Sequence, residues 1–333
     1  NIGVDFSMFD QHFYGSVEYF NSKSKDLLVK LPISWTEGTD ITPWSNYGKL
    51  KNTGVEINLG YRETKRAFKY NIGLNLSHVK NEVLELGESF REGGTNGVNR
   101  SEKGRSVGDF YVIKTNGIFQ SWDEVYAHTT TVTENGQTIT KLIQPDAHPG
   151  DIRYIDANND GKIDKDDRVN LGSALPDFYG SFFTSVEYKG IQLSLTFGYS
   201  KGNKMYNAVR RSMESMSDFS NQLTSVNRRW MAEGQITDMP RAVYGDPMEN
   251  NRFSDRWIED ASYLKLKELM VSYKFKLFAG TTVFVAAENL FTATDYLGLD
   301  PETMYSYDSS MRGFDYGKVA NPRTVKFGFK VQF

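Results

Sequence analysis

The sequence predicts an all-β protein built from about nine antiparallel strands, because apolar and polar residues alternate in one segment after another. Alternation with a period of two places every second side chain on the same face of a strand. Several of the connecting segments are very short, which suits antiparallel neighbours. The segments expected to form strands span residues 2–8, 13–19, 55–61, 68–76, 182–188, 191–199, 269–275, 282–290 and 325–333.

Composition excludes several classes of protein. The 333 residues carry a formal net charge of −3, which gives no reason to expect nucleic acid as a partner. The chain has no Cys, so it has neither a disulfide framework nor a thiolate metal site. A mean hydropathy of −0.52, without an apolar run of about 18 residues, excludes a transmembrane helix. A transmembrane barrel remains possible, because a barrel strand needs only about 9–11 residues with every second one apolar.

The connections between the strands decide between a soluble sandwich and a membrane barrel. Short and long connections alternate strictly along the chain, as they do in outer-membrane barrels with short periplasmic turns and long extracellular loops. A compact soluble domain rarely carries several long loops at one end. The aromatic content of 14% suits a barrel with aromatic girdles, although an aromatic-rich sandwich would also account for it. The short connections lie around residues 10–11, 63–66, 189–190 and 276–280, and the long ones span about 21–52, 81–178, 201–262 and 292–322.

One loop has the pattern of a calcium site. The segment "DANNDGKIDKDD" places oxygen ligands at the spacing of an EF-hand loop, with Gly161 at the sharp turn in position six. It departs from that pattern by ending on Asp instead of Glu, which resembles the calcium loop of dockerin modules. An Asp- and Gly-rich turn that binds nothing is the alternative. The expected ligands are Asp156, Asn158, Asp160, the backbone carbonyl of Lys162, Asp164 and Asp167.

Catalytic motifs are not found in the sequence. The four His residues form no HExxH motif, metal pair or nucleophile elbow, and the chain has no P-loop and no GxGxxG. We therefore expect no enzymatic activity and no required cofactor beyond a possible structural Ca²⁺. The first residues already read as a strand, without an initiator Met or a signal core, so the chain is expected to be part of a longer protein.

Six stretches, in order along the chain, resemble the C-terminal barrel region of the SusC/RagA family of TonB-dependent outer-membrane transporters. The resemblance implies that residues 1–333 are the last strands of a barrel of about 22 strands. It also implies that the plug domain and the first strands are absent from this chain. The stretches are "YFNSKSKDLLVKLPI", "NTGVEINLGY", "GDIRYIDANNDGKIDKDDRVNLGSALPDFYGSF", "RRWMAEGQITDMPR", "SDRWIEDASYLKLKELMVSYKF" and "AENLFTATDYLGLDPE".

The end of the chain resembles the assembly signal of outer-membrane barrels. That signal has a polar residue, a Gly two positions later and two apolar residues at alternate positions, of which the last is aromatic. Lys326, Gly328, Val331 and Phe333 occupy these places. The resemblance therefore implies that the barrel-assembly machinery recognises the last strand, which then closes the barrel against the first one.

The resemblance also implies a function. The protein is expected to be a multi-pass outer-membrane importer that works with a SusD-like surface lipoprotein and with the TonB complex, which it would contact through the absent N-terminal part. The ligand is expected to be an oligosaccharide, and an oligopeptide is the alternative. Membrane lipid would surround the strands, and the segment 81–178 would lie outside the cell, provided that "DFYVIKTNGIFQ" does not span the membrane. A passive porin, an adhesin barrel and a soluble calcium-dependent lectin-like sandwich are the remaining alternatives.

Overall fold

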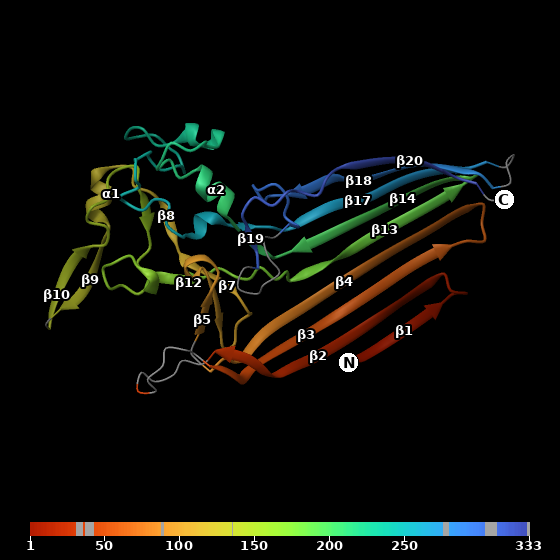
Figure 1. Cartoon of the computed structure of the whole chain (residues 1–333), viewed down its shortest axis with the longest axis horizontal. Coiled ribbons are helices and arrows are strands. Elements are labelled where there is room, and N and C mark those ends of the chain that lie inside the picture. The colour runs from red at the N-terminus through yellow and green to blue at the C-terminus, as the bar shows by residue number, and fades with distance from the viewer. Residues whose placement is uncertain are drawn as a thin grey trace.

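A nine-stranded antiparallel sheet dominates the computed structural model (Figure 1). The structure describes residues 1–30, 36, 43–87, 90–134, 136–275, 280–303 and 312–331. Each strand of the sheet pairs with the next strand of the sheet along the chain, and β1 and β20 form the two edges. The strands are β1 (Ile2–Met8), β2 (Phe13–Lys30), β3 (Trp44–Glu63), β4 (Phe68–Glu85), β13 (Phe178–Tyr188), β14 (Ile191–Lys201), β17 (Tyr263–Lys274), β18 (Thr282–Thr294) and β20 (Thr324–Lys330). The predicted all-β fold of about nine antiparallel strands is confirmed.

The two faces of the sheet differ in chemistry, as the alternation predicts. One face carries exposed apolar side chains, among them Leu193, Val271 and Phe327. The opposite face carries polar pairs between neighbouring strands. Asn75 Nδ2 donates to Ser181 Oγ at 2.9 Å, and Lys69 Nζ lies 3.0 Å from Glu187 Oε1. Such cross-strand pairs stabilise a sheet and help to set its register.

Aromatic side chains cover glycines of the neighbouring strand on the polar face. The ring of Tyr14 lies so close to Gly60 that a Cβ there would be 2.2 Å from Tyr14 Cζ. Phe183 covers Gly73 in the same way. Any larger residue at these glycines would displace the ring, so each pairing helps to hold its two strands in register.

All short connections lie at one end of the sheet and all long connections lie at the other (Figure 1). The turn between β13 and β14 is the tightest. Lys189 and Gly190 both have positive φ, 49° and 86°, as a two-residue hairpin turn of type I′ requires. The predicted alternation of short and long connections is therefore confirmed.

The first long connection is much shorter than the predicted 21–52, and that boundary was wrong. β2 and β3 stay paired up to Lys30 and Trp44, so the connection spans 31–43. The polar run "NSKSKD" has no apolar alternation, which is why the pattern predicts a loop there. Backbone pairing does not depend on apolar side chains, and it continues past a bulge at which Asp26 has a φ of 58°.

Small elements fold within the long connections. β5, β6, β7 and β12 form one small sheet, and β15, β16 and β19 form another. β9 and β10 form a hairpin, and β8 pairs with β11, which lies further along the chain. The segment "DFYVIKTNGIFQ" forms β7 and β8 outside the main sheet, as the topology requires. Among the described residues, no helix is long and apolar enough to cross a membrane. The bounds are β5 (Phe90–Gly93), β6 (Asn99–Glu102), β7 (Asp109–Ile113), β8 (Thr115–Ile118), β9 (Thr129–Glu134), β10 (Gln137–Leu142), β11 (Ile152–Tyr154), β12 (Arg168–Asn170), β15 (Lys204–Asn207), β16 (Ile258–Asp260), β19 (Phe314–Asp315), α1 (Trp122–Ala127), α2 (Ala208–Met213), and the 3₁₀ turns η2 (Thr95–Gly97), η3 (Lys165–Asp167), η4 (Thr224–Arg228) and η5 (Asp255–Trp257).

Candidate functional site

The long connections 86–177, 202–262 and 295–323 pack into one body beyond the end of the sheet, which we call the loop domain (Figure 1). Its main core takes side chains from all three connections. The fully buried members are Val98, Phe110, Val112, Tyr206, Trp257 and Phe314. Because the connections share one core, the surface that they present is held in a defined shape.

An ion-pair network surrounds Trp257 inside the loop domain. Arg210 lies between two glutamates, with its Nε 3.1 Å from Glu214 Oε2 and its Nη1 3.0 Å from Glu259 Oε1. Arg256 Nη2 lies 3.4 Å from the same oxygen of Glu214. The two guanidinium groups lie over the Trp257 ring, at 5.5 and 5.1 Å from its centroid. These charges are largely buried and paired, so the network fixes α2 against η5.

A second network joins the loop domain to the end of β17. Lys265 Nζ lies 3.0 Å from Asp300 Oδ2 and 2.8 Å from Glu302 Oε2, and its side chain is only 3% exposed. Tyr263 donates its hydroxyl to Glu302 Oε1 at 2.8 Å. Burial alone would raise the pKa of Glu302, but the hydrogen bonds from Lys265, Lys267 and Tyr263 together lower it. The segment after β18 is therefore anchored back onto the sheet.

The predicted calcium loop is folded around hydrogen bonds of its own backbone. Asp156 accepts from the backbone N–H of Gly161 at 2.9 Å, and Asp167 accepts from that of Ala157 at 2.8 Å and from that of Asp164 at 2.8 Å. Burial raises the pKa of Asp167. The side chains of Asn158, Asp160 and Asp164 accept from the backbone N–H groups of Asp160, Lys162 and Asp166.

The side-chain oxygens of this loop are of the kind that binds Ca²⁺, but they are not arranged around one common position. Throughout the described ranges, no group of three or more His, Asp or Glu side chains is arranged to hold a metal ion. In the loop, carboxylates that would meet at a cation accept backbone N–H groups instead. Calcium binding by this loop therefore stays a prediction.

Two residues of the predicted assembly signal, Lys326 and Gly328, lie within β20. Lys326 and Gly328 are on the polar face, opposite Ala286 and Phe284 of β18. Val331 directly follows the strand, and Phe333 lies outside the described residues. Recognition of this segment by the barrel-assembly machinery stays a prediction.

The described Trp residues differ widely in exposure, and Trp230 is half-buried. Trp257 is 1% exposed and lies in the core of the loop domain, whereas Trp44 and Trp122 are 61% and 42% exposed. Trp122 stacks on Tyr126, with a centroid distance of 5.8 Å. Trp35 lies outside the described residues. Packing between loops therefore accounts for Trp257, while Trp44 and Trp122 retain accessible ring surface.

Sequence reasoning missed the buried polar residues that hold the loop domain together. Asp151 is fully buried and is bound by Arg241 and Asn250, which lie 90 and 99 residues further along the chain. The stretches that contain Asp151 and Arg241 are noted above only because they resemble the SusC/RagA family. Nothing in the sequence around Asn99 and Asp109, at the start of β6 and β7, indicated that these two side chains are buried.

Comparison with known proteins agrees with this architecture. No protein-family model matches the chain. TonB-dependent receptor P3 of Formosa agariphila is 28% identical over the whole chain, which covers 34% of that receptor. TonB-dependent receptor P26 of the same organism is also 28% identical, and TonB-dependent receptor SusC of Bacteroides thetaiotaomicron is 23% identical, again over the whole chain. The chain thus spans about a third of the length of the curated relatives that it matches.

Solved structures agree on the fold. The chain superposes on a chain of the RagAB peptide transporter with a TM-score of 0.74 and 22% identity, covering 98% of this chain and 34% of that one. The RagAB peptide importer in its 'closed-closed' state gives the same TM-score at 20% identity. The nine-stranded sheet therefore has the fold of part of the RagAB transporter barrel. Over its whole length the chain is thus similar to TonB-dependent receptors, SusC among them, as the resemblance in its sequence implied.

Proposed function

We propose that the full-length protein is a TonB-dependent importer of the outer membrane, to which this chain contributes the last nine strands of the barrel and their loops. The observation that carries this proposal is the sheet itself. Its strands are apolar on one face and polar on the other, and all of its long connections gather at one end. An apolar face suits lipid, a polar face suits a lumen, and the gathered loops suit ligand capture outside the cell.

The proposed partners follow from the relatives. These relatives are TonB-dependent receptors, SusC among them, and the RagAB transporter. We expect a SusD-like lipoprotein to cap the loop domain and the TonB complex to act on a part of the protein outside this chain. The relatives are receptors and transporters, so the proposed role is not enzymatic.

The proposed ligand is an oligomeric nutrient too large for passive porins. An oligosaccharide is the first candidate, because the resemblance to the SusC/RagA family implies glycan uptake. An oligopeptide is the second candidate, and the RagAB structures, which are named as peptide transporters, favour it. A passive porin or an adhesin barrel would share the sheet but would not depend on TonB.

A disruption experiment tests the proposed function. Disrupting the full-length gene should abolish growth of its host strain on one defined glycan or peptide mixture as sole carbon source. Disrupting the TonB complex should have the same effect, and the protein should fractionate with the outer membrane. Unchanged growth on every mixture, or uptake that continues without TonB, would contradict the proposal.

A further inference from the structure

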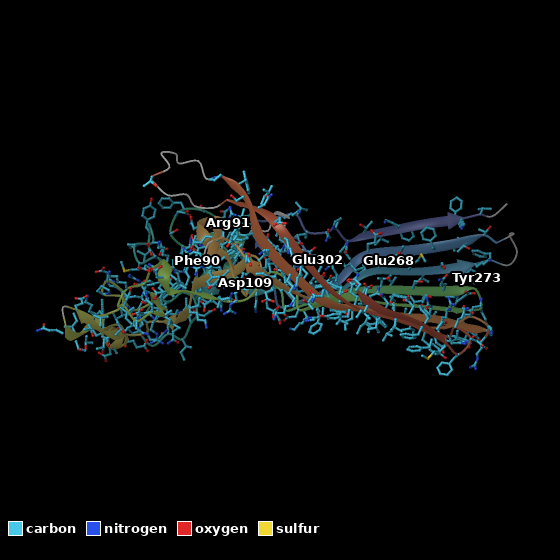
Figure 2. All side chains as sticks on the ribbon, turned by 90° about the horizontal axis from the view of Figure 1, so that it is seen from below. Phe90, Arg91, Asp109, Glu268, Tyr273 and Glu302 are labelled. Carbon is cyan, nitrogen blue, oxygen red and sulfur yellow. The ribbon has the colours of Figure 1, made fainter. Side chains whose placement is uncertain are left out.

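A cavity of about 520 Å³ lies between the outer ends of β2–β4 and the small sheet of β5, β6 and β7. The extended strands supply one wall, and the start of the connection 86–177 supplies the other. Figure 2 shows Phe90, Arg91 and Asp109 close together at this end of the sheet, far from Tyr273 near the opposite end. A volume of this size accommodates a few residues or sugar units of a small ligand.

The lining of the cavity combines an aliphatic part with polar side chains, which are Lys49, Glu85, Arg91, Glu92, Asn99 and Ser101. Six apolar side chains face it: Leu27, Leu28, Val29, Leu50, Leu86 and Val107. Trp44 adds an aromatic surface at its border. A sugar unit placed against the aliphatic part of the lining would press hydroxyl groups against carbon, where they would lose their hydrogen bonds to water without replacement. An apolar side chain would instead gain from leaving water.

One buried polar atom in the lining has no partner. Asn99 is 1% exposed, and its Nδ2 donates to the carbonyl of Gly108 at 2.7 Å. Its Oδ1 has no hydrogen-bond partner among the residues that the structure describes. Buried carbonyl oxygens in proteins almost always accept a hydrogen bond, so this atom needs a donor. A single amide N–H beside an apolar group would match it.

The wall that carries Asn99 is held rigidly. The guanidinium of the adjacent Arg100 lies between two rings, 3.9 Å from the centroid of Phe90 and 4.5 Å from that of Tyr111. Arg100 and Arg168 both approach Glu92, at 3.7 and 3.8 Å. On the facing wall, Lys49 Nζ pairs with Glu85 Oε2 at 2.6 Å. The cavity is therefore a preformed apolar site with charged groups at its border, which suit the main chain or termini of a peptide.

We propose that this cavity binds an apolar side chain of an oligopeptide, while Asn99 Oδ1 accepts an N–H group of the peptide backbone. This inference rests on the proposed import function and favours its second ligand candidate. Within that function, the cavity discriminates by residue type. Peptides with Leu or Phe bind, and peptides with only small or acidic residues bind weakly.

The test uses the full-length transporter purified with its lipoprotein, and two probe pools. One pool contains hexapeptides that differ at a single position, occupied by Ala, Leu, Phe or Asp, and the other contains defined unsubstituted oligosaccharides. Retained molecules are identified by native mass spectrometry. We expect the wild-type complex to retain the Leu and Phe hexapeptides and to show at least a tenfold preference for them over the Asp hexapeptide, a difference of about 1.4 kcal/mol.

Two variants and a control locate the binding site. Val107→Phe fills the cavity and should abolish the preference for Leu and Phe. Asn99→Ala removes the acceptor and should weaken the binding of every hexapeptide about tenfold. The preference for the Leu and Phe hexapeptides should stay unchanged. Val319→Phe, at a position that is 84% exposed on another connection, should behave as the wild type does. Heat-modifiable migration in detergent establishes that each variant is folded.

The outcomes separate this inference from the proposed function. Unchanged peptide binding in both cavity variants overturns the inference, as does retention of the oligosaccharide pool alone, and both results leave import intact. Normal binding by Asn99→Ala also overturns the inference when Val107→Phe does not fold, because it shows that peptides do not need the proposed acceptor. Retention of neither pool by the wild-type complex counts against the inference and the proposed function alike.

Discussion

Arg241 donates two hydrogen bonds to the buried carboxylate of Asp151, with Nε 2.6 Å from Oδ1 and Nη2 3.0 Å from Oδ2. Asn250 Nδ2 and the backbone N–H of His148 bind the same carboxylate, at 2.9 and 2.8 Å. Asp151 belongs to the connection 86–177, and Arg241 and Asn250 belong to 202–262. The pair therefore ties two connections of the loop domain to each other.

Replacing Arg241 with Ala should loosen the loop domain. The change leaves the fully buried carboxylate of Asp151 without its counter-charge, which typically costs about 3–5 kcal/mol. Hydrogen exchange should accelerate across residues 146–154 and 236–250 and stay unchanged in β13 and β14. Arg228→Ala is the matched control, because Arg228 and Asp238 form a pair exposed by 57% and 63%. Such exposed pairs contribute about 1 kcal/mol or less, so equal effects of the two variants would contradict a stabilising role for Asp151–Arg241.

Acidification should also loosen the part of the loop domain around α1. Burial lowers the pKa of His128 below its ordinary value of 6.5, although its hydrogen bond with the carbonyl of Tyr154 acts in the opposite direction. Because the folded state favours neutral His128, its contribution is complete above pH 6.5 and is lost as the pH falls below that value. After correction for the intrinsic pH dependence of amide exchange, residues 122–128 and 152–154 should therefore be less protected at pH 5.5 than at pH 7.5. His128→Gln should remove most of that difference, and an undiminished difference in this variant would assign it to other groups.

The two faces of β14 should respond differently to a charge. Leu193 lies on the apolar face, and Ser194, its neighbour, points to the polar face. Leu193→Arg should cost about 2–4 kcal/mol if Leu193 lies near the middle of the bilayer, and Ser194→Arg should cost much less. The fraction of full-length protein that shows heat-modifiable migration in outer-membrane extracts measures this. A greater loss for Ser194→Arg would mean that the two faces are assigned the wrong way round.

Calcium should stabilise the loop at 156–167 if that segment binds the ion. Outside the cell, a site with a dissociation constant of about 10⁻⁴–10⁻³ M would be occupied. In the full-length protein, hydrogen exchange of this loop should slow in millimolar Ca²⁺ relative to chelator. The double variant Asp156→Ala and Asp160→Ala should lose that response, while Asp123→Ala combined with Asp146→Ala should keep it. Absence of any calcium response in the wild-type protein would dismiss the site.

The strands were predictable because each one carries its own signal. The alternation in "IQLSLTFGYS" predicts which side chains of β14 share a face, and the turn at Lys189–Gly190 shows where β14 begins. The outer halves of β2 and β3 were missed because their pairing is made by backbone groups in a polar run. Their length shows only in the structure, since strand pairing depends on the partner strand as much as on the local sequence.

The interior of the loop domain could not be predicted for a different reason. Asp151 and Arg241 stand 90 residues apart, and nothing in either local sequence indicates the other. Asn99 is one of many Asn residues in loops, and only the fold buries it beside an apolar cavity. Long-range contacts of this kind depend on how three separate connections pack, which a pattern of single residues does not encode.

The central claim is that the loop domain faces the outside of the cell and the short turns lie on the other side of the outer membrane. The accessibility of introduced cysteines on intact cells tests it most directly. This chain has no Cys of its own, so single Cys residues can be introduced at will into a full-length protein made free of other Cys. Gln137→Cys lies in the β9–β10 hairpin of the loop domain, and Lys189→Cys lies in the turn at the opposite end of the sheet (Figure 1). A membrane-impermeant maleimide should label the Gln137→Cys variant on intact cells and the Lys189→Cys variant only after the outer membrane is permeabilised. Labelling of the Lys189→Cys variant on intact cells, with the Gln137→Cys variant protected until permeabilisation, would contradict the account.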